Sequence, residues 1–446
     1  MDYSRFFSSD VPSFLRSPVR EIFRKVDLAA IYSFAGGYPD AATFPVEDIK
    51  RLSAYVLEKY GTKALQYGAT QGVTELREAI SRRYGVPLEN IQITTSSQQG
   101  IDVCTRILAD PGDTVLVTTP TYLGALQSFR AYRANVCPLE DFVAGRSVFS
   151  VPGELSVREV MEARKASSVL EEDDSLRACR PRRGRGGTAC GGVENVRNFC
   201  DSAKISDFFD SGESHLTPGP KFCYVIPDFQ NPSGQTMTLK ERETLVAMAR
   251  EKDFLIVEDS PYRELRYSGE DVPTIYSLAP ERTLHLGSFS KIFAPGFRLG
   301  WIFGPQELLE QIYVCKQALD LCPPIFDQYM AAEFMASGAL DANLEKSVRL
   351  YRSKRDLMLS LLEKYMPEGV SWTHPEGGLF LFLTLPPEID TVALYDKALA
   401  AGVAYVAGSF FYPDGSHRNT MRLNFSFLDA SRMEEGVRIL ANIIKQ

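Results

Sequence analysis

The sequence has no long hydrophobic run. No stretch of its 446 residues approaches the roughly 18 uninterrupted apolar residues that a membrane-spanning helix requires. The opening segment, MDYSRFFSSDVPSFLRSPVREIF, is amphipathic and lacks the continuous apolar core and the small-residue cleavage site of a signal peptide. Because its charges are mixed, a transit peptide stays open as an alternative. We expect a protein without a membrane partner.

Cysteine pairs with the spacing of a disulfide framework or a metal site are also lacking. The eight cysteines are scattered along the chain, among them Cys104, Cys223 and Cys315. In a chain of this length, scattered cysteines indicate reduced thiols in a cytoplasmic protein. Cys179, Cys190 and Cys200 lie close together but do not form a C-x-x-C pattern, so we expect no metal site.

The chain carries little excess charge of either sign. Its formal net charge of −8 gives no reason to expect nucleic acid or a membrane as a partner. The arginine-rich stretch RACRPRRGRGGTACGG (177–192) could be a nucleic-acid-binding arm, but the acidic EEDD (171–174) just before it cancels much of its field. Glycine, proline and clustered charge mark residues 141–218 as a loop-like insertion. We therefore expect no nucleic-acid partner.

Short apolar runs alternate with helical patterns over the first two thirds of the chain. The runs are nearly continuous in apolar residues, as buried parallel strands are; they cover 114–120, 221–229, 254–260 and 283–290. Thr238 and Glu241 form the T-x-x-E pattern of a capping box, which opens a helix between two of these runs. Alternation of this kind predicts an α/β fold with a mostly parallel sheet.

After Gly304 the pattern indicates a smaller α+β unit. Helical patterns cover 305–321 and 341–366, and strand-like runs cover 378–385, 403–408 and 421–427. A last helix is predicted to begin at Ser431 as its cap, with Glu434 three residues on. We divide the chain into an N-terminal arm that joins the small domain (1–45), a large domain with the insertion (46–325) and a C-terminal small domain (326–446).

Polar side chains follow several predicted strands at their carboxyl ends, the edge at which open α/β sheets bind ligands. Lys291 follows the run 283–290, and Asp259 ends FLIVED with Tyr262 three residues on. Asn231 follows another run, and residues 97–99 precede a helical pattern, where backbone N–H groups can hold an anion. An amine, a carboxylate, neutral donors and an anion cradle are what pyridoxal phosphate requires.

Three segments carry a resemblance to a known family. SFSKIFAPGFRLGW (288–301) resembles the lysine segment of the class I/II aminotransferases, which are fold-type I pyridoxal-phosphate enzymes. PDFQNPSG (227–234) is similar to their N-P-[TS]-G segment, and VEDSPYRELRY (257–267) to their [ED]-D-x-x-Y segment. The likeness covers nearly the whole chain except 141–218. The opening segment and TSSQQGID (95–102) look most like the kynurenine/2-aminoadipate branch, with bacterial multi-substrate relatives equally near.

The resemblance implies pyridoxal phosphate as the cofactor and a ping-pong transfer of an amino group between an L-amino acid and a 2-oxo acid. It suggests an aromatic, 2-aminoadipate or aliphatic donor. Lys291 would form an imine with the coenzyme and move the substrate proton, and Asp259 would pair with the pyridine nitrogen. Tyr262 and Asn231 would donate to the ring oxygen. The other implied cofactor contacts are Tyr122, stacked on the ring, and Ser96, Ser97, Gln98, Ser288, Ser290 and Arg298 around the phosphate. Tyr67 would reach the phosphate of the neighbouring subunit, which implies a homodimer with shared sites.

Four further positions are candidates to face the substrate, together with Asn231. Arg422, in TMRLNFS, matches the arginine that binds the substrate carboxylate in this family, a pairing that orients the α-carbon; the alternative is a strand arginine in a surface ion pair. Gly36 and Gly37 would bring the backbone close to the substrate, or form a plain turn. Phe380 is either a wall of the site or part of the core.

The resemblance leaves some questions open. Ser96 stands where this branch usually has a glycine, and its side chain is tolerable only with an ordinary backbone angle. A β-eliminating C–S lyase on the same scaffold is the alternative activity, and would not require a 2-oxo acid. An effector-sensing regulator needs a DNA-binding domain ahead of SFAGGYPD; because that motif begins at Ser33, we do not expect one.

Overall fold

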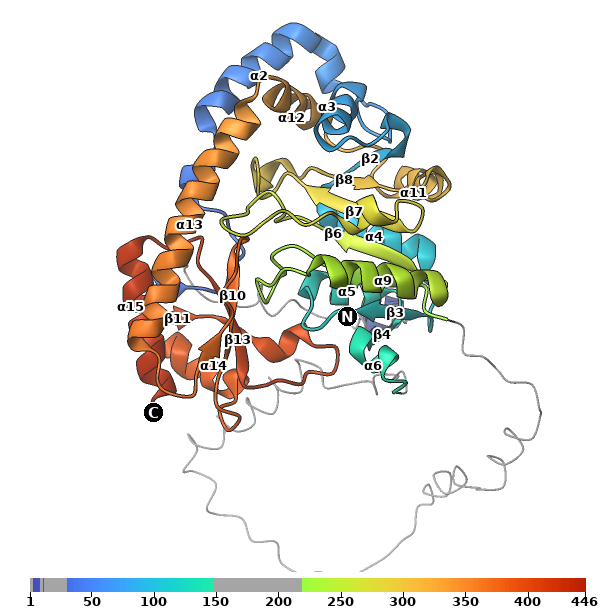
Figure 1. The fold of residues 1–446 in the computed structure, drawn as a ribbon. Helices are drawn as coiled ribbons and strands as arrows, with labels where there is room; N and C mark the ends of the chain where they lie inside the picture. Colours follow the sequence, from blue (N-terminus) through green and yellow to red (C-terminus); the bar gives the residue numbers. More distant parts are fainter. Residues whose placement is uncertain (1–2, 9–10, 12–29, 147–218) are drawn as a thin grey trace, which may run out of the picture. The chain divides into compact units, whose positions relative to one another are not determined.

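A seven-stranded sheet is the largest feature of the structure (Figure 1). The computed structural model describes residues 3–8, 11, 30–146 and 219–446, which fall within one compact unit. The strands lie in the order β2-β8-β7-β6-β5-β3-β4, and only β8 runs against its neighbours. Their bounds are β2 (Ile91–Thr94), β3 (Thr114–Val117), β4 (Asn135–Pro138), β5 (Phe222–Val225), β6 (Leu255–Asp259), β7 (Thr283–Ser288) and β8 (Gly300–Phe303). The predicted α/β fold with a mostly parallel sheet is confirmed.

The apolar runs mark the strands correctly but extend beyond them at the carboxyl ends. β5 ends at Val225 and β7 at Ser288, whereas the runs continued to residues 229 and 290. The residues after each strand leave the hydrogen-bonded ladder while staying buried, as Phe229 and Phe289 do. Burial without strand pairing is what makes a run of apolar residues overestimate a strand.

Helices cover both faces of this sheet. One core contains strand residues such as Val115 and Leu286 together with the helix residues Ile101 and Phe129; the opposite core contains Leu116 and its neighbours. The helices near the sheet are α4 (Ser96–Leu108), α5 (Leu123–Ala131), α6 (Leu139–Val143), α9 (Leu239–Glu251), α10 (Ile275–Leu278) and α11 (Gln306–Leu319). The predicted capping box of α9 is present, since Thr238 and Glu241 hydrogen-bond each other's backbone N–H groups.

A second, antiparallel sheet lies in the order β12-β13-β10-β9. Its strands are β9 (Ser371–Trp372), β10 (Phe380–Thr384), β12 (Val406–Ala407) and β13 (Thr420–Asn424), and a separate parallel pair joins β1 (Tyr32–Ser33) to β11 (Val403–Ala404). The long helix α13 (Ala339–Tyr365) packs against α15 (Ala430–Ile444), and α14 (Thr391–Ala400) packs against β11 and β12 (Figure 1). The expected smaller α+β part is therefore present.

Two helix assignments need correction. α12 (Ile325–Ala336), which packs against α2 (Val46–Tyr60) and α3 (Thr74–Tyr84), was not predicted, because most of its residues are apolar and buried and it shows no polar stripe. The predicted cap of the last helix was wrong. Asp429, not Ser431, accepts the N-terminal hydrogen bond, from the backbone N–H of Arg432 at 2.9 Å, and α15 begins at Ala430.

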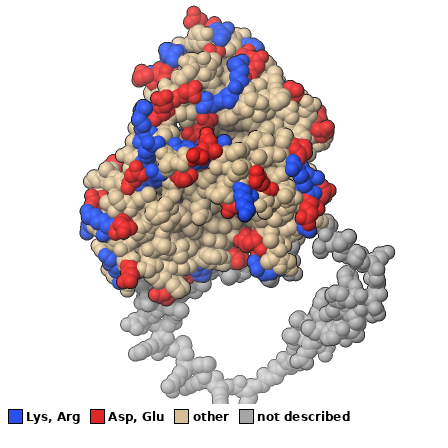
Figure 2. Space-filling view, in the orientation of Figure 1, with Lys and Arg blue, Asp and Glu red and all other residues tan. Residues whose placement is uncertain are grey.

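Several sequence features lie outside the described residues. They include the arginine-rich stretch, Cys179, Cys190, Cys200 and all of the predicted insertion except residues 141–146, of which the first three belong to α6. Cys104, Cys223 and Cys315 are free thiols. Within the described ranges no helix is long and apolar enough to cross a membrane. Over the described residues that Figure 2 displays, basic and acidic side chains are interspersed.

Candidate active site

Lys291 lies on the connection between β7 and β8. Its Nζ donates a hydrogen bond of 2.8 Å to the carbonyl oxygen of Gly37. Burial lowers the pKa of this amine to about 8, and the positive charges of Arg298 and Arg422 act in the same direction. A fraction of the amine is therefore neutral near pH 7 to 8, as an amine that accepts protons must be.

Asp259 is the last residue of β6 and is fully buried. Its Oδ2 accepts a 2.7 Å hydrogen bond from the hydroxyl of Tyr224 on β5, while its Oδ1 is buried without a partner in the described residues. Burial raises the pKa of this carboxyl to about 7, although the Tyr224 hydroxyl opposes the rise. A cation or N–H group next to Oδ1 would satisfy the unpaired atom and favour the carboxylate.

Arg422 is buried on β13, so the surface ion pair is not its role. Its Nη1 donates to Oδ1 of Asn231 at 2.7 Å and its Nη2 to the carbonyl oxygen of Ala35 at 2.5 Å, whereas Nε has no partner among the described residues. Burial lowers the pKa of this guanidinium to about 10, which still leaves it a cation at neutral pH. A buried cation without a paired carboxylate is suited to bind one.

Aromatic rings enclose this cation. The guanidinium carbon of Arg422 lies 4.3 Å from the ring centre of Phe380 and 5.2 Å from that of Phe411. Tyr262 meets Phe380 edge-on, with ring centres 5.8 Å apart, and burial raises the pKa of its hydroxyl, which stays a donor. Phe380 thus belongs to the core, and its ring also lies against Arg422, so its role as a wall of the site stays a prediction.

The predicted phosphate-binding residues gather where β2 leads into α4. Ser96 begins this helix, and its Oγ accepts a 2.7 Å hydrogen bond from Nη2 of Arg298. The backbone φ of Ser96 is +72°, so the ordinary angle that would make a serine harmless here is absent. A Cβ on Gly300 would lie 2.8–2.9 Å from backbone atoms of Ser96 and Ser97, so only glycine lets β8 approach this turn.

The neighbouring predicted residues have definite partners. The Oγ of Ser288 accepts from the backbone N–H of Ser290 at 3.1 Å, and Nε2 of Gln98 donates to the carbonyl oxygen of Gly124 at 3.1 Å. Tyr122 precedes α5 and is half-buried. Tyr67, by contrast, is 79% exposed.

Sequence reasoning missed three contributors. Tyr224, which holds Asp259, is a tyrosine within an otherwise apolar strand, and that hydroxyl was a signal in the sequence. Phe411 and the carbonyl oxygen of Ala35 were missed because they reach Arg422 only through chain folding, which brings residues far apart in sequence together.

The residues present fit pyridoxal phosphate. Lys291 offers an amine of lowered pKa, Oδ1 of Asp259 is an acceptor without a partner, and the turn at Ser96 brings Arg298 to a helix N-terminus. The family model described as aminotransferase class I and II matches residues 34–142 and 220–440. The chain belongs to this family. It is a pyridoxal-phosphate-dependent aminotransferase, which transfers an amino group between an amino acid and a 2-oxo acid.

The aminotransferase is similar to characterised relatives over its whole length. It is 38% identical to aromatic-amino-acid aminotransferase 1 of Thermococcus litoralis, covering 100% of this chain and 95% of the relative. It is 31% identical to the 2-aminoadipate transaminase of Thermus thermophilus, covering 100% and 98%. The crystal structure of Pyrococcus horikoshii kynurenine aminotransferase, in complex with PMP, is 38% identical with a TM-score of 0.79, covering 100% and 98%.

Proposed function

We propose that this aminotransferase takes an L-amino acid with an aromatic, 2-aminoadipate or aliphatic side chain as its donor and a 2-oxo acid as its acceptor, in a ping-pong reaction. One observation carries the proposal. Lys291 and Arg422 both donate to carbonyl oxygens of one short segment, those of Gly37 and Ala35. A substrate whose carboxylate is bound by Arg422 therefore presents its α-carbon near Lys291. The names of the relatives support the donor class.

The proton-transfer step falls to Lys291. When bound, pyridoxal phosphate supplies a ring system that stabilises negative charge at the substrate α-carbon. The neutral amine of Lys291 accepts the proton of the α-carbon, because its pKa of about 8 keeps part of it unprotonated. Asp259 would pair its negative charge with the ring nitrogen of the coenzyme, and the hydroxyl of Tyr262 and the amide of Asn231 would donate to the ring oxygen.

Substrate orientation falls to Arg422. Its guanidinium binds the substrate carboxylate, and Asn231 and the Ala35 carbonyl hold its two terminal nitrogens in place. The rings of Phe380 and Phe411 cover it and exclude water, which strengthens the ion pair. Because Gly37 has no side chain, its backbone can lie close to the Phe380 ring; a Cβ there would lie 3.0 Å from Cζ of Phe380.

The assembly and location are part of the same proposal. The high exposure of Tyr67 supports a homodimer in which this residue completes the phosphate site of the neighbouring subunit. Ser97, Gln98, Ser288 and Ser290 would hold the phosphate with Arg298, and Tyr122 would stack on the ring. The division at residues 45 and 325 into arm, large domain and small domain stays a prediction, as does the cytoplasmic location.

The test is an absorption spectrum of the purified holoenzyme, followed by single additions of amino acids without any 2-oxo acid. The panel contains L-phenylalanine, L-kynurenine, L-2-aminoadipate, L-leucine and L-glutamate. We expect stoichiometric conversion of the bound coenzyme to its pyridoxamine form, fastest with the true donor. S-methyl-L-cysteine is added separately because its β-carbon carries a thiolate leaving group; continuous release of methanethiol, pyruvate and ammonia from it, without that conversion, would instead identify a lyase.

A further inference from the structure

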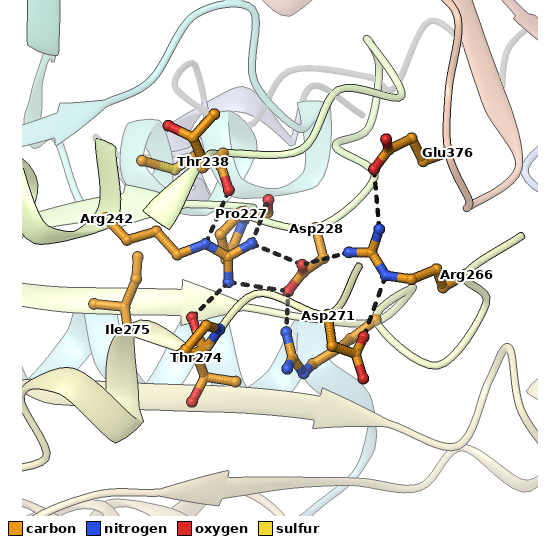
Figure 3. Close-up of polar contacts among 12 residues, drawn as sticks. Pro227, Asp228, Thr238, Arg242, Arg266, Asp271, Thr274, Ile275 and Glu376 are labelled. Atoms are coloured by element: carbon orange, nitrogen blue, oxygen red, sulfur yellow. Dashed lines mark hydrogen bonds and ion pairs between the residues drawn. The ribbon is translucent and has the colours of Figure 1, made fainter. Parts of the chain in front are cut away.

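A buried ion-pair cluster is centred on Asp228, three residues before Asn231 in the chain (Figure 3). Asp228 follows β5 and Arg242 lies in α9, and both side chains are 0% exposed. Arg242 Nη2 meets Asp228 Oδ1 at 2.7 Å, and Nη1 approaches Oδ2 at 3.4 Å. Asp228 Oδ2 also accepts from Arg263 at 3.0 Å, and Arg266 approaches Oδ1 at 3.8 Å. One carboxylate thus faces three guanidinium groups.

Such a cluster is a costly way to stabilise a fold, because burying charges removes their hydration. Well-packed apolar residues of similar volume often stabilise a protein equally well or better. The geometric demands of bidentate guanidinium–carboxylate pairs, on the other hand, fix the positions of the segments that carry them. The cluster therefore serves to fix the positions of the segments that carry its members.

The first element it holds is the loop between Pro227 and Met237. Arg242 donates to the carbonyl oxygens of both residues, each at 3.1 Å, and the backbone N–H of Met237 donates to Pro227 at 2.8 Å. The two ends of the loop are thereby tied together. Asn231 lies inside this loop, and its Oδ1 accepts the 2.7 Å hydrogen bond from Arg422.

The second element is the entry to β10. Arg266, which lies over the ring of Phe229 at 4.7 Å, donates to Glu376 Oε2 at 3.0 Å (Figure 3). The backbone N–H of Tyr267 donates to the Glu376 carbonyl at 2.7 Å. Four residues after Glu376 comes Phe380, whose ring lies against Arg422.

Asn231 and Phe380, two residues that contact Arg422, are thus both connected to the carboxylate of Asp228. We propose that Asp228 is a positioning residue for substrate binding, which fixes Asn231 through Arg242 and Phe380 through Arg266 and so sets the place of the Arg422 guanidinium. Asp228 touches neither substrate nor coenzyme in this account. The inference rests on the proposed function of Arg422 as the carboxylate-binding residue.

The test measures selectivity for the carboxylate, which a purely structural role would not change. The rate at which the holoenzyme's coenzyme spectrum converts is measured with L-phenylalanine, or with the fastest amino acid of the panel, and with the amine that this amino acid gives on decarboxylation. The ratio of the two second-order rate constants reports the contribution of Arg422. Arg422→Lys serves as the reference and should lower the ratio.

Three further variants address the cluster. Asp228→Asn should lower the ratio by about 100-fold, because a displacement of about 1 Å in a substrate-holding group has an effect of this size. Glu376→Gln removes the half-exposed partner of Arg266 and should lower the ratio several-fold in a folded enzyme. Asp271→Asn is the matched control, because Asp271 also pairs with Arg266, at 3.2 Å, but is 80% exposed and makes no link to β10; it should change nothing.

The outcomes separate the two proposals. If Arg422→Lys leaves the ratio unchanged, the proposed role of Arg422 is wrong. If Arg422→Lys lowers the ratio but Glu376→Gln does not, the positioning role is overturned. It is also overturned if the cluster variants lower the rate constant for the amine as much as that for the amino acid. If Asp228→Asn fails to fold, the test of the positioning role is the comparison of the rate-constant ratio between Glu376→Gln and Asp271→Asn.

Discussion

At the scale of single residues, Asp259 and Lys291 have pKa values shifted in opposite directions by the same burial. The pKa of Asp259 is raised from 3.8 to about 7, and that of Lys291 is lowered from 10.5 to about 8. Each group is therefore closer to its neutral form in the folded protein than in the unfolded chain. Both shifts describe the protein before the coenzyme is bound, and they have a measurable effect on stability.

We expect the contribution of these two groups to the free energy of unfolding of the coenzyme-free protein to be smallest between pH 7 and 8. From pH 4 to 7 the folded state binds more protons at Asp259 than the unfolded state, so the free energy of unfolding falls as pH rises, by a few kcal/mol. From pH 8 to 10.5 the folded state binds fewer protons at Lys291 than the unfolded state, so the free energy of unfolding rises again. This rise is smaller than the fall at lower pH, because the amine is partly reached by solvent. Urea unfolding across pH measures both arms. Asp259→Asn should remove the first and Lys291→Met the second; an unchanged slope in either variant contradicts the assignment.

Ser96 combines an unfavourable backbone angle with a useful side chain. Ser96→Gly should raise the free energy of unfolding by about 1 kcal/mol, because glycine adopts a φ of +72° without strain. The same change should weaken coenzyme binding several-fold, because Arg298 loses its hydrogen-bond acceptor. Ser96→Ala is the control: it keeps the strain and should weaken binding without any gain in stability. Full affinity in Ser96→Ala would show that the hydroxyl does not orient Arg298.

At the scale of elements, the sequence predicted what local chemistry determines. The capping box of α9 and the places of β5, β6 and β7 follow from residues close together in the chain. The buried helix α12 has no polar stripe, so its pattern gave no periodic signal. In the site, Lys291 was predictable because it directly follows an apolar run, and Asp259 because it lies near the end of one. The carbonyls of Ala35 and Gly37 were not, because any residue supplies a carbonyl and only the fold selects these two.

The start of α15 can be tested directly. Asp429→Ala should lower the free energy of unfolding by about 1 kcal/mol, because it removes the acceptor for the backbone N–H of Arg432. Ser431→Ala, which changes the position favoured by the sequence pattern, should have almost no effect, since Ser431 is exposed inside the helix. Thermal or chemical unfolding of both variants measures the difference. The reverse order would restore the sequence-based assignment.

Gly300 tests the packing of β8 against the turn into α4. Gly300→Ala should reduce coenzyme affinity by about tenfold or more and lower the free energy of unfolding by about 1–3 kcal/mol, because its Cβ would meet backbone atoms of Ser96 and Ser97 that cannot move independently. Gly296→Ala is the matched control, because Gly296 lies on the connection just before β8 and a Cβ there meets nothing within 4 Å. Coenzyme titration followed by fluorescence gives the affinities. Equal behaviour of the two variants would mean that the turn adapts to the extra atom.

At the scale of the whole molecule, the exposed Tyr67 predicts a functional dimer. Tyr67→Phe should weaken coenzyme binding by about tenfold, because one hydrogen bond to a charged group is lost. When Tyr67→Phe and Lys291→Ala subunits are mixed and re-associated, the hybrid contains one intact site if Tyr67 serves its neighbour. Activity at limiting coenzyme should then rise on mixing. If mass spectrometry shows that hybrids have formed but activity does not rise, Tyr67 contributes to the site of its own subunit.

The bond between Arg422 and the Ala35 carbonyl joins residues 387 positions apart in the chain. During synthesis on the ribosome, Lys291, Asp259 and Arg298 are made well before Arg422. The groups expected to hold the coenzyme can therefore be present in a nascent chain that still has no means of gripping an amino acid. The pocket itself is complete only later still, because Phe289 and Ile292 beside Lys291 share a hydrophobic core with Met421 and Leu440; a chain that stops short of residue 422 would therefore lose both the pocket and the selectivity for the carboxylate.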